Sequence, residues 1–176
     1  LADVSSISFA SIMIITILAI FILKEKVGIR RWIAIFFGFV LNMIDPKKSV
    51  QIGLRTENPD TFDFNILDGD WVHKNGIDAV IEKTLSIVGN HPVYMTFDID
   101  CLDPSYAPGT GTPVCGGLTT HQAMSIIRGF MGINLIGMDV VEVAPAYDVS
   151  EITALAASHI PMEMISVFAS KSEFQS

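Results

Sequence analysis

The sequence predicts an α/β fold built around a parallel sheet. From Pro46 onward, short apolar strand patterns alternate with amphipathic helix patterns, as in chains whose parallel strands are joined by helical crossovers. Two of the predicted strands, residues 93–99 and 134–143, are almost continuously apolar, which is typical of strands covered on both faces. A separate apolar segment comes first, so we divide the chain into residues 1–44 and 45–176.

Residues 1–44 are predicted to be an apolar helical segment and a candidate for spanning a membrane. Residues 7–23 carry no charge and have close to the shortest length that crosses a bilayer core of roughly 30 Å. Charged residues follow this run instead of preceding it, which does not fit a signal peptide. The membrane interpretation places the contact at residues 7–44, and the alternative is a buried hairpin of helices in a soluble core.

The α/β part begins with a strand predicted at residues 49–55, whose alternate apolar side chains share one face. A turn is expected at residues 58–63, where proline stands among polar neighbours. A helix is predicted over residues 76–89, because apolar side chains recur there at helical spacing and a Gly-Asn pair ends the pattern. The buried strand at residues 93–99 follows.

The next predicted helix covers residues 119–130. Thr119 or Thr120 is expected to cap it, since a threonine hydroxyl can accept a hydrogen bond from the free N–H groups of the first turn. Apolar residues at helical spacing indicate the face that packs inward. The apolar strand at residues 134–143 comes next.

A last helix is predicted to start at Glu151, with Ser150 as its cap. Pro161 interrupts its apolar pattern. Because proline lacks an N–H group and clashes with the preceding turn, we expect a kink or a break after His159.

Carboxylates stand at the ends of the two most apolar strands. Asp98 and Asp100 end the first, and Glu142 ends the second. The carboxyl ends of parallel strands form the crevice in which such folds bind ligands. Asp98 and Asp100 are two residues apart, so both side chains can point to the same place, and hard oxygen ligands favour Mg, Mn or Ca. The alternative is local turn chemistry, to which we assign Asp103.

The loop over residues 105–119 follows the carboxylates directly. It contains four glycines and two prolines in the stretch SYAPGTGTPVCGGLT. A long, shaped loop beside a charged strand end is more often functional than idle. We therefore expect it to line a ligand site.

Two stretches of the chain read FDIDCLDPSYAPGTGTPVCGGLT and GMDVVEVAPAYDVSEITALAA. Both are similar to stretches of the ureohydrolase (arginase) family. The resemblance covers the chain from about Asp45 onward, and VEVAPAYD resembles the agmatinase branch. It implies the C-terminal part of a three-layer α/β/α fold. Within residues 1–41, the stretch ILKEKVGIRRWIAIFFGF resembles the closing helices of a drug/metabolite transporter, which implies a membrane origin for that segment.

The resemblance also implies a reaction, namely manganese-dependent hydrolysis of a guanidino substrate. Agmatine, converted to putrescine and urea in polyamine biosynthesis, is the substrate that it favours. Asp98 and Asp100 match catalytic residues that act as metal ligands of a binuclear Mn²⁺ centre, and Glu142 and Thr112 match substrate-binding residues. A cytoplasmic location and a homo-oligomeric assembly are implied as well.

The family's remaining metal ligands are not found in the chain. They come from Gly-Gly-Asp-His and Asp-Ala-His-x-Asp motifs, and neither occurs in the 176 residues. The four histidines lack the spacing of those motifs and are expected to be surface or structural residues: His73 and His91 in turn-like surroundings, His121 and His159 on helices. We therefore expect an incomplete ligand set.

Two other functions remain open. The first is a catalytically inactive, membrane-associated or chimeric fragment, with its junction at residues 41–45. The second is another Asp-x-Asp enzyme, such as a Mg-dependent phosphotransferase, which the lack of a supporting Lys and Ser/Thr motif disfavours.

Composition excludes one class of partner. The formal net charge is −8, and only 11 residues are Lys or Arg against 19 that are Asp or Glu. Nucleic-acid binding needs clustered basic residues, so we do not expect it. Cys101 and Cys115 are too few for a disulfide framework and favour free thiols in a reducing compartment.

Overall fold

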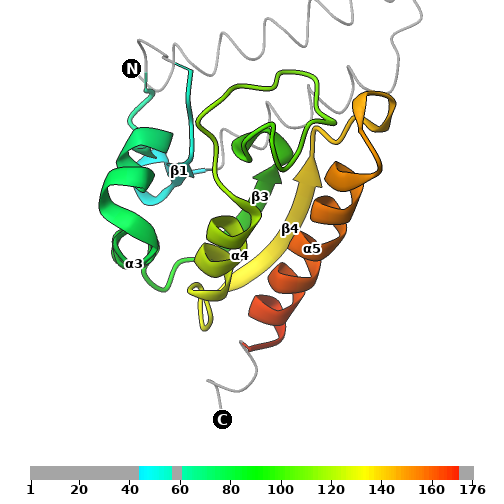
Figure 1. Ribbon diagram of the computed structural model, residues 1–176. Coiled ribbons are helices and arrows are strands. Elements are labelled where there is room, and N and C mark those ends of the chain that lie inside the picture. The colour runs from blue at the N-terminus through cyan, green and yellow to red at the C-terminus, as the bar shows by residue number, and fades with distance from the viewer. Residues whose placement is uncertain (1–43, 57–60, 171–176) are drawn as a thin grey trace, which may run out of the picture. The chain divides into compact units, whose positions relative to one another are not determined.

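The computed structural model describes residues 44–56 and 61–170. The apolar segment predicted at residues 1–44 lies outside this part except for Ile44, as does half of the turn predicted at 58–63. In the described part, strands and helices alternate along the chain (Figure 1), which confirms the predicted α/β class. The elements, in order, are η1 Pro46–Lys48, β1 Val50–Ile52, β2 Asn65–Leu67, α3 Gly69–Val88, β3 Val93–Asp98, η2 Ile99–Cys101, α4 Thr120–Arg128, β4 Leu135–Val141, η3 Pro145–Tyr147 and α5 Ile152–Ser170.

All described strands pair in parallel, as predicted. They form two sheets of two strands, with β1 beside β2 and β3 beside β4. The register of the second sheet runs from Val93 opposite Leu135 to Asp98 opposite Val141. Asp98 and Glu142, the residue after Val141, therefore lie at the same edge of one sheet.

Helix α3 is longer than predicted. It begins at Gly69, where the Asp68 carboxylate accepts a hydrogen bond of 2.7 Å from the Trp71 N–H and caps the first turn. The helix is kinked at Gly76, whose φ of 83° only glycine adopts easily. The sequence prediction found the part after the kink and missed both the first turns and the short strand β2.

Helix α4 starts as predicted, with Thr119 as its cap. Thr119 and Gln122 form a capping box, in which each side chain accepts a hydrogen bond from the other residue's backbone N–H. The inward face is apolar, and the residues buried there are Ala123, Ile126 and Ile127.

The prediction that Ser150 caps α5 is wrong. Ser150 and Glu151 both have positive φ, 54° and 59°, and lie in a turn before the helix. The Asp148 carboxylate instead accepts hydrogen bonds from the N–H groups of Thr153 and Ala154, at 3.0 and 2.9 Å. An acid that reaches forward across the turn replaces the expected local cap.

The predicted break at Pro161 is also wrong, because α5 continues through it to Ser170. Pro161 removes one N–H from the helical ladder, whereas Ile160 and Met164 beside it are almost completely buried. Packing of the apolar face therefore outweighs the local cost of proline. Among the described residues, α5 is the helix whose length and hydropathy would suit a membrane span. A core helix of a soluble protein has the same properties, so this is weak evidence for a membrane position.

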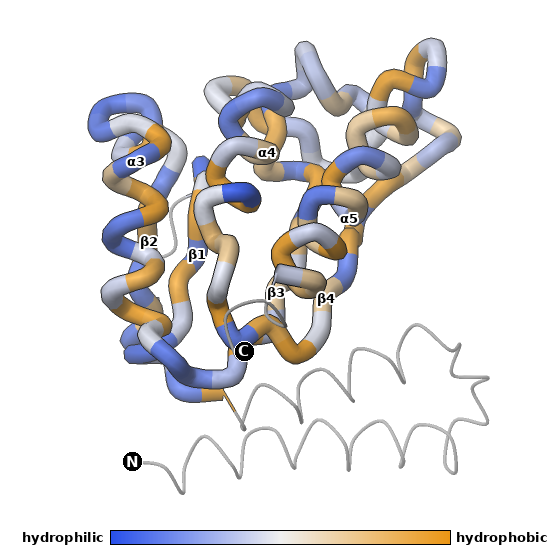
Figure 2. The backbone as a smooth tube through the Cα atoms, turned by 90° about the horizontal axis from the view of Figure 1, so that it is seen from below, coloured by the Kyte–Doolittle hydropathy of each residue, from blue (hydrophilic) through white to orange (hydrophobic). Residues whose placement is uncertain are grey.

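The core lies where α4 and α5 cover one face of the β3–β4 sheet (Figures 1 and 2). Its most buried side chains come from all of these layers and their connections, and include Ile99, Leu102, Leu135, Ile160, Met164 and Val167. The opposite face of β3 is exposed in this structure, with Tyr94 at 53%. The expectation that both faces of this strand are covered is wrong here, since Thr96 and Asp98 are exposed as well.

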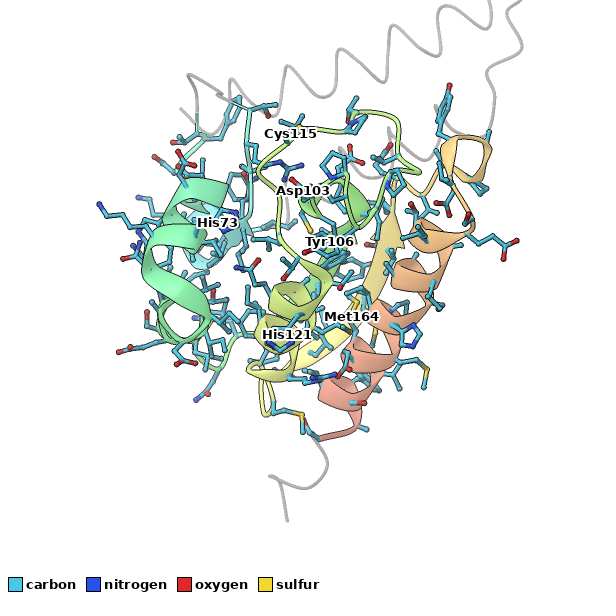
Figure 3. All side chains as sticks on the ribbon, in the orientation of Figure 1. His73, Asp103, Tyr106, Cys115, His121 and Met164 are labelled. Atoms are coloured by element: carbon cyan, nitrogen blue, oxygen red, sulfur yellow. The ribbon has the colours of Figure 1, made fainter. Side chains whose placement is uncertain are left out.

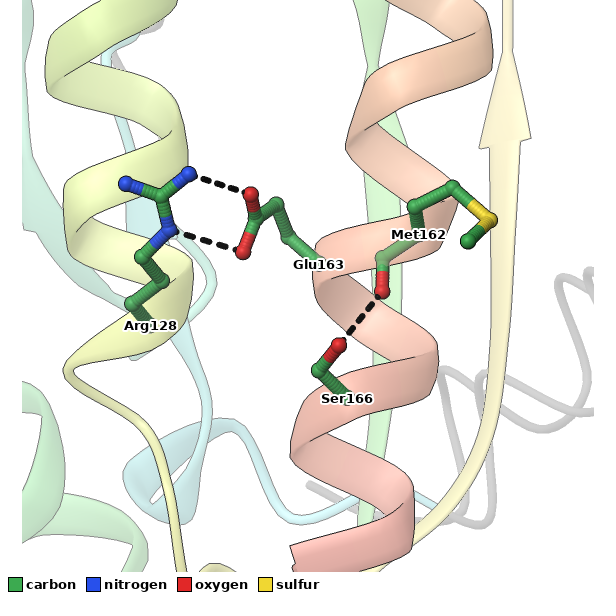
Figure 4. Close-up of polar contacts among 4 residues, drawn as sticks. All are labelled: Arg128, Met162, Glu163 and Ser166. Atoms are coloured by element: carbon green, nitrogen blue, oxygen red, sulfur yellow. Dashed lines mark hydrogen bonds and ion pairs between the residues drawn. The ribbon is translucent and has the colours of Figure 1, made fainter.

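One ion pair joins the two helices of this layer. The Arg128 guanidinium on α4 binds both carboxylate oxygens of Glu163 on α5 (Figure 4), with Nε 2.8 Å from Oε2. The contact raises the pKa of Arg128 and lowers that of Glu163. Because the arginine side chain is 56% exposed, solvent screens the pair and its contribution to stability is small.

Candidate active site

The acid pair lies where β3 ends. Asp98 is the last residue of the strand, and Asp100 lies in the 3-10 turn η2 that follows. The Asp98 Oδ1 accepts a hydrogen bond of 2.9 Å from the Asp100 N–H. The expectation that strand alternation aligns the two side chains is therefore corrected, since a capped turn brings them together.

Thr112 reaches the same place from the loop. Its hydroxyl donates a short hydrogen bond to Oδ2 of Asp100. The other carboxylate oxygen of Asp100, Oδ1, is buried and has no hydrogen-bond partner among the described residues. A buried carboxylate oxygen without a donor is costly unless a cation or another donor binds it.

Glu142 follows β4 and has a φ of 64°, a left-handed conformation that is unusual for this residue type. The next residues bind the loop: Val143 forms an antiparallel bridge with Thr110, and the Ala144 N–H donates to the Gly109 carbonyl at 2.8 Å. The turn that carries Glu142 is thus held against the loop that carries Thr112. Strained backbone of this kind is common at functional sites.

The charges of these residues act on one another. Loss of solvent around Asp98 raises its pKa, and the charges of Asp100 and Glu142 raise it further. The hydrogen bond from the Asp100 N–H and the charge of Arg55 oppose this rise. The negative charges of Asp100 and Glu142 thus act on Asp98, and repulsion between carboxylates favours a bound cation.

Asp103 is a structural acid, as predicted. Its carboxylate accepts hydrogen bonds from the N–H groups of Ser105, Gly116 and Gly117, at 3.0, 2.8 and 3.2 Å. These bonds, with that of the Ser105 side chain first, lower the pKa of Asp103 to about 2. Figure 3 shows Asp103 near the end of β3, beneath the part of the loop that carries Cys115. The Asp103 carboxylate therefore binds both ends of the 105–119 loop.

Sequence reasoning missed three residues that shape this site. Arg55, which follows β1, donates hydrogen bonds to backbone carbonyl groups of η2 and of the loop. Thr153 on α5 is fully buried, and its hydroxyl accepts a bond of 2.7 Å from the Gly109 N–H. Asp148 joins the same group by capping α5. For these three residues the sequence offers one weak signal, namely that a charged or polar side chain follows a strand or a turn.

One of the four histidines lies in surroundings other than those predicted. His73 lies on α3 and not in a turn, with Nε2 3.1 Å from the Gly116 carbonyl oxygen (Figure 3). His121 lies on α4 and His159 on α5, as predicted. His91 follows α3 in a turn, also as predicted.

The acid pair offers oxygen ligands of the kind that manganese accepts. Carboxylate oxygens suit this ion, and the free oxygen of Asp100 is available to it. Over residues 44–56 and 61–170, however, no three His, Cys, Asp or Glu side chains gather into one metal-binding group. These residues would therefore supply part of a metal site.

Most of this chain is similar to part of several known proteins. The chain is 60% identical to the agmatinase of Chromobacterium violaceum over 129 residues, which cover 73% of this chain and 40% of that protein. A crystal structure of a hypothetical agmatinase from Burkholderia thailandensis is 55% identical, with a TM-score of 0.75 over 79% of this chain and 44% of that one. Proclavaminate amidino hydrolase from Streptomyces clavuligerus is 33% identical, with a TM-score of 0.73 over 77% of this chain and 47% of its own.

The chain spans about two fifths of the length of the curated relatives that it matches. Its fold is the corresponding part of the three-layer α/β/α ureohydrolase fold. The arginase family model matches residues 28–166, which is well over half of the sequence. The chain therefore belongs to the arginase family.

Proposed function

We propose that this chain takes part in hydrolysis of a guanidino substrate, with agmatine cleaved to putrescine and urea as the favoured reaction. The main support for the proposal is that hydrogen bonds join Asp98, Asp100 and Thr112 at the end of β3. The charge of Glu142 also acts on Asp98. Membership of the arginase family and high identity to proteins named agmatinase support the substrate class.

Each residue has a proposed role. Asp98 and Asp100 would hold manganese, which when bound supplies an activated water for hydrolysis. Glu142 would bind the substrate's guanidinium, because a planar cation and a carboxylate form paired, charge-assisted hydrogen bonds. Thr112 would line the same pocket while its hydroxyl orients the Asp100 carboxylate.

Urea release from agmatine in the presence of added Mn²⁺ tests this function. The informative variant is Asp98→Asn, which keeps the side-chain shape and the acceptor for the Asp100 N–H but loses the charge. Asp78→Asn is the matched control, because Asp78 is exposed on α3, an element that carries none of the proposed site residues. Release by the parent chain and by the control, with none by Asp98→Asn, is the result that supports this function, whereas activity retained in Asp98→Asn would contradict the assignment.

A second candidate is a chain with no catalysis on its own. The absence of a three-ligand metal group from the described residues favours it. A folded chain that neither releases urea nor binds Mn²⁺, measured by the electron paramagnetic resonance signal of the free ion, would support this candidate over the first. Membrane association of such a fragment remains part of the same proposal, through residues 7–44.

Assembly and location follow from the same proposal. We propose a homo-oligomer that acts on a small guanidino molecule in the cytoplasm. Large apolar side chains exposed on α5 offer a surface for subunit contact, and they include Leu155, Met162, Ile165 and Phe168. Light scattering of the purified chain tests the oligomeric state.

A further inference from the structure

Arg55 joins three segments that meet beside the acid pair. Its guanidinium donates to the Gly53 carbonyl at 2.8 Å, to the Cys101 carbonyl at 3.2 Å and, by a short bond, to the Asp100 carbonyl. Nε donates to the Val114 carbonyl at 3.0 Å. One half-buried side chain thus binds the end of β1, the turn η2 and the loop after it.

Two glycines, Gly53 and Gly69, lie near this side chain. A Cβ atom at Gly69 would lie 3.1 Å from Cγ of Arg55 and 3.3 Å from the Gly116 carbonyl oxygen. At Gly53, with a φ of 81°, the chain turns out of β1, and a Cβ atom there would contact Cys101 and Leu118. The stem of Arg55 therefore lies in a narrow space between the first sheet and the loop.

The carbonyl groups that Arg55 binds belong to the residues that shape the site. Asp100 carries one of the proposed metal ligands, and Val114 lies two residues after Thr112, which donates to that same carboxylate. Without the guanidinium, the carbonyl groups of Asp100 and Cys101 would lose their shared donor and their dipoles would repel each other. The planar fork of arginine binds several acceptors in fixed directions, which the point charge of lysine cannot reproduce.

We propose that Arg55 is a positioning residue, whose guanidinium holds the η2 turn and the 105–119 loop in the arrangement that brings Asp98, Asp100 and Thr112 together. This inference rests on the proposed function, since the acid pair must be aligned only if it binds a cation. Arg55 acts through the backbone and is not placed in contact with substrate.

Three variants of the full chain test the proposal. Arg55→Met removes the donors and keeps most of the stem, and Arg55→Lys keeps the charge without the fork. Arg128→Met is the matched control, because Arg128 also joins two elements, α4 and α5, through Glu163 (Figure 4). Two readouts are needed: hydrogen exchange of the bonded amides of residues 102–103 and 116–118, and Mn²⁺ affinity from the electron paramagnetic resonance signal.

We expect Arg55→Met to speed exchange of these amides by about tenfold or more relative to α5, and to weaken Mn²⁺ binding by about 10- to 100-fold, the usual effect of losing a group that orients a metal ligand. Arg55→Lys should fall between this variant and the parent chain. Arg128→Met should leave both readouts at the parent level. If Arg55→Met does not fold, Arg55→Lys decides by the same two readouts.

Two results would overturn the inference. One is exchange in the Arg55 variants that is unchanged or faster uniformly along the chain, and the other is Mn²⁺ affinity equal to that of the parent chain. A parent chain that binds no Mn²⁺ contradicts the proposed function alone. In that case local exchange still decides whether Arg55 holds the turn and the loop.

Discussion

The helical layer and the strand-end region of this molecule are stabilised in different ways. In the layer formed by α4 and α5, apolar side chains at helical spacing pack on β3 and β4, and Ile160, Met164 and Val167 are almost completely buried. In the strand-end region, which comprises residues 98–119 and 142–153, side chains bind backbone groups far away in the sequence. Arg55 donates a hydrogen bond to the Val114 carbonyl, 59 residues away in the sequence. The Thr153 hydroxyl accepts one from the Gly109 N–H, 44 residues away.

The two kinds of interaction, apolar packing and directed hydrogen bonds, suit the different tasks of the two regions. Packing of apolar faces tolerates local irregularity, as the passage of α5 through Pro161 demonstrates. The strand-end region instead places a carboxylate beside a hydroxyl and keeps a left-handed residue, Glu142, at a defined position. Directed hydrogen bonds are suited to that task because they fix both distance and orientation.

The largest expected effect comes from Gly117→Ala in the loop. A Cβ atom at this position would lie 2.3 Å from the Asp103 nitrogen and 2.5 Å from the Leu102 carbonyl carbon, so backbone would have to move. We expect the free energy of unfolding to fall by roughly 4 kcal/mol in chemical denaturation, since displacement also disrupts the bonds to Asp103.

Gly111→Ala is the control for that substitution. No described atom lies within 4 Å of a Cβ atom at Gly111, although it belongs to the same loop. Its effect should stay within about 0.5 kcal/mol. Equal destabilisation by the two substitutions would mean that the loop is not held against residues 102–103 as described.

A smaller effect is expected from Met164→Ala in the helical layer. Met164 is fully buried, so its truncation removes apolar contacts and leaves a cavity, which costs roughly 3 kcal/mol. Met162→Ala on the same helix should change the stability of the monomeric chain by less than about 0.5 kcal/mol, because Met162 is 62% exposed there. Thermal or denaturant unfolding of the pair measures the difference, and equal losses would contradict the assigned inward face of α5.

The same contrast explains how far the sequence could predict the structure. Strands β3 and β4 and helix α4 follow from periodicity and from the Thr119 cap, which are local signals. Asp98, Asp100 and Glu142 were predicted as site residues because they stand at the ends of strands. Thr112 was predicted from the resemblance to the arginase family.

The partners that hold these residues could not be predicted in this way. The cap of α5 by Asp148, the bonds of Arg55 and the buried hydroxyl of Thr153 depend on contacts between distant segments, for which local propensity carries no information. Strand β2 has only three residues, too few for a periodic pattern. The prediction at Pro161 was wrong because it used local propensity where packing decides.

The smallest expected effects are on the pH dependence of stability, in which two acids of the strand-end region, Asp103 and Asp98, should differ in sign. Asp103 has its pKa lowered to about 2 by hydrogen bonds, so its ionisation stabilises the folded chain above pH 4, and this contribution disappears as the pH falls towards 2. Asp98 has a raised pKa, so its ionisation costs stability at neutral pH, and that cost disappears in acid.

Denaturant unfolding of Asp103→Asn and Asp98→Asn between pH 3 and 7, with metal chelated, measures both contributions. At pH 7 Asp103→Asn should be less stable than the parent chain, because asparagine has only one acceptor oxygen and cannot accept the bonds to both carboxylate oxygens of Asp103. Asp98→Asn should be more stable, because asparagine keeps the acceptor for the Asp100 N–H without the charge. Both differences should shrink below pH 4. Loss of stability in Asp98→Asn at pH 7 would show that its neighbours stabilise the carboxylate, whereas a gain is the pattern expected where an acid is retained for binding and not for folding.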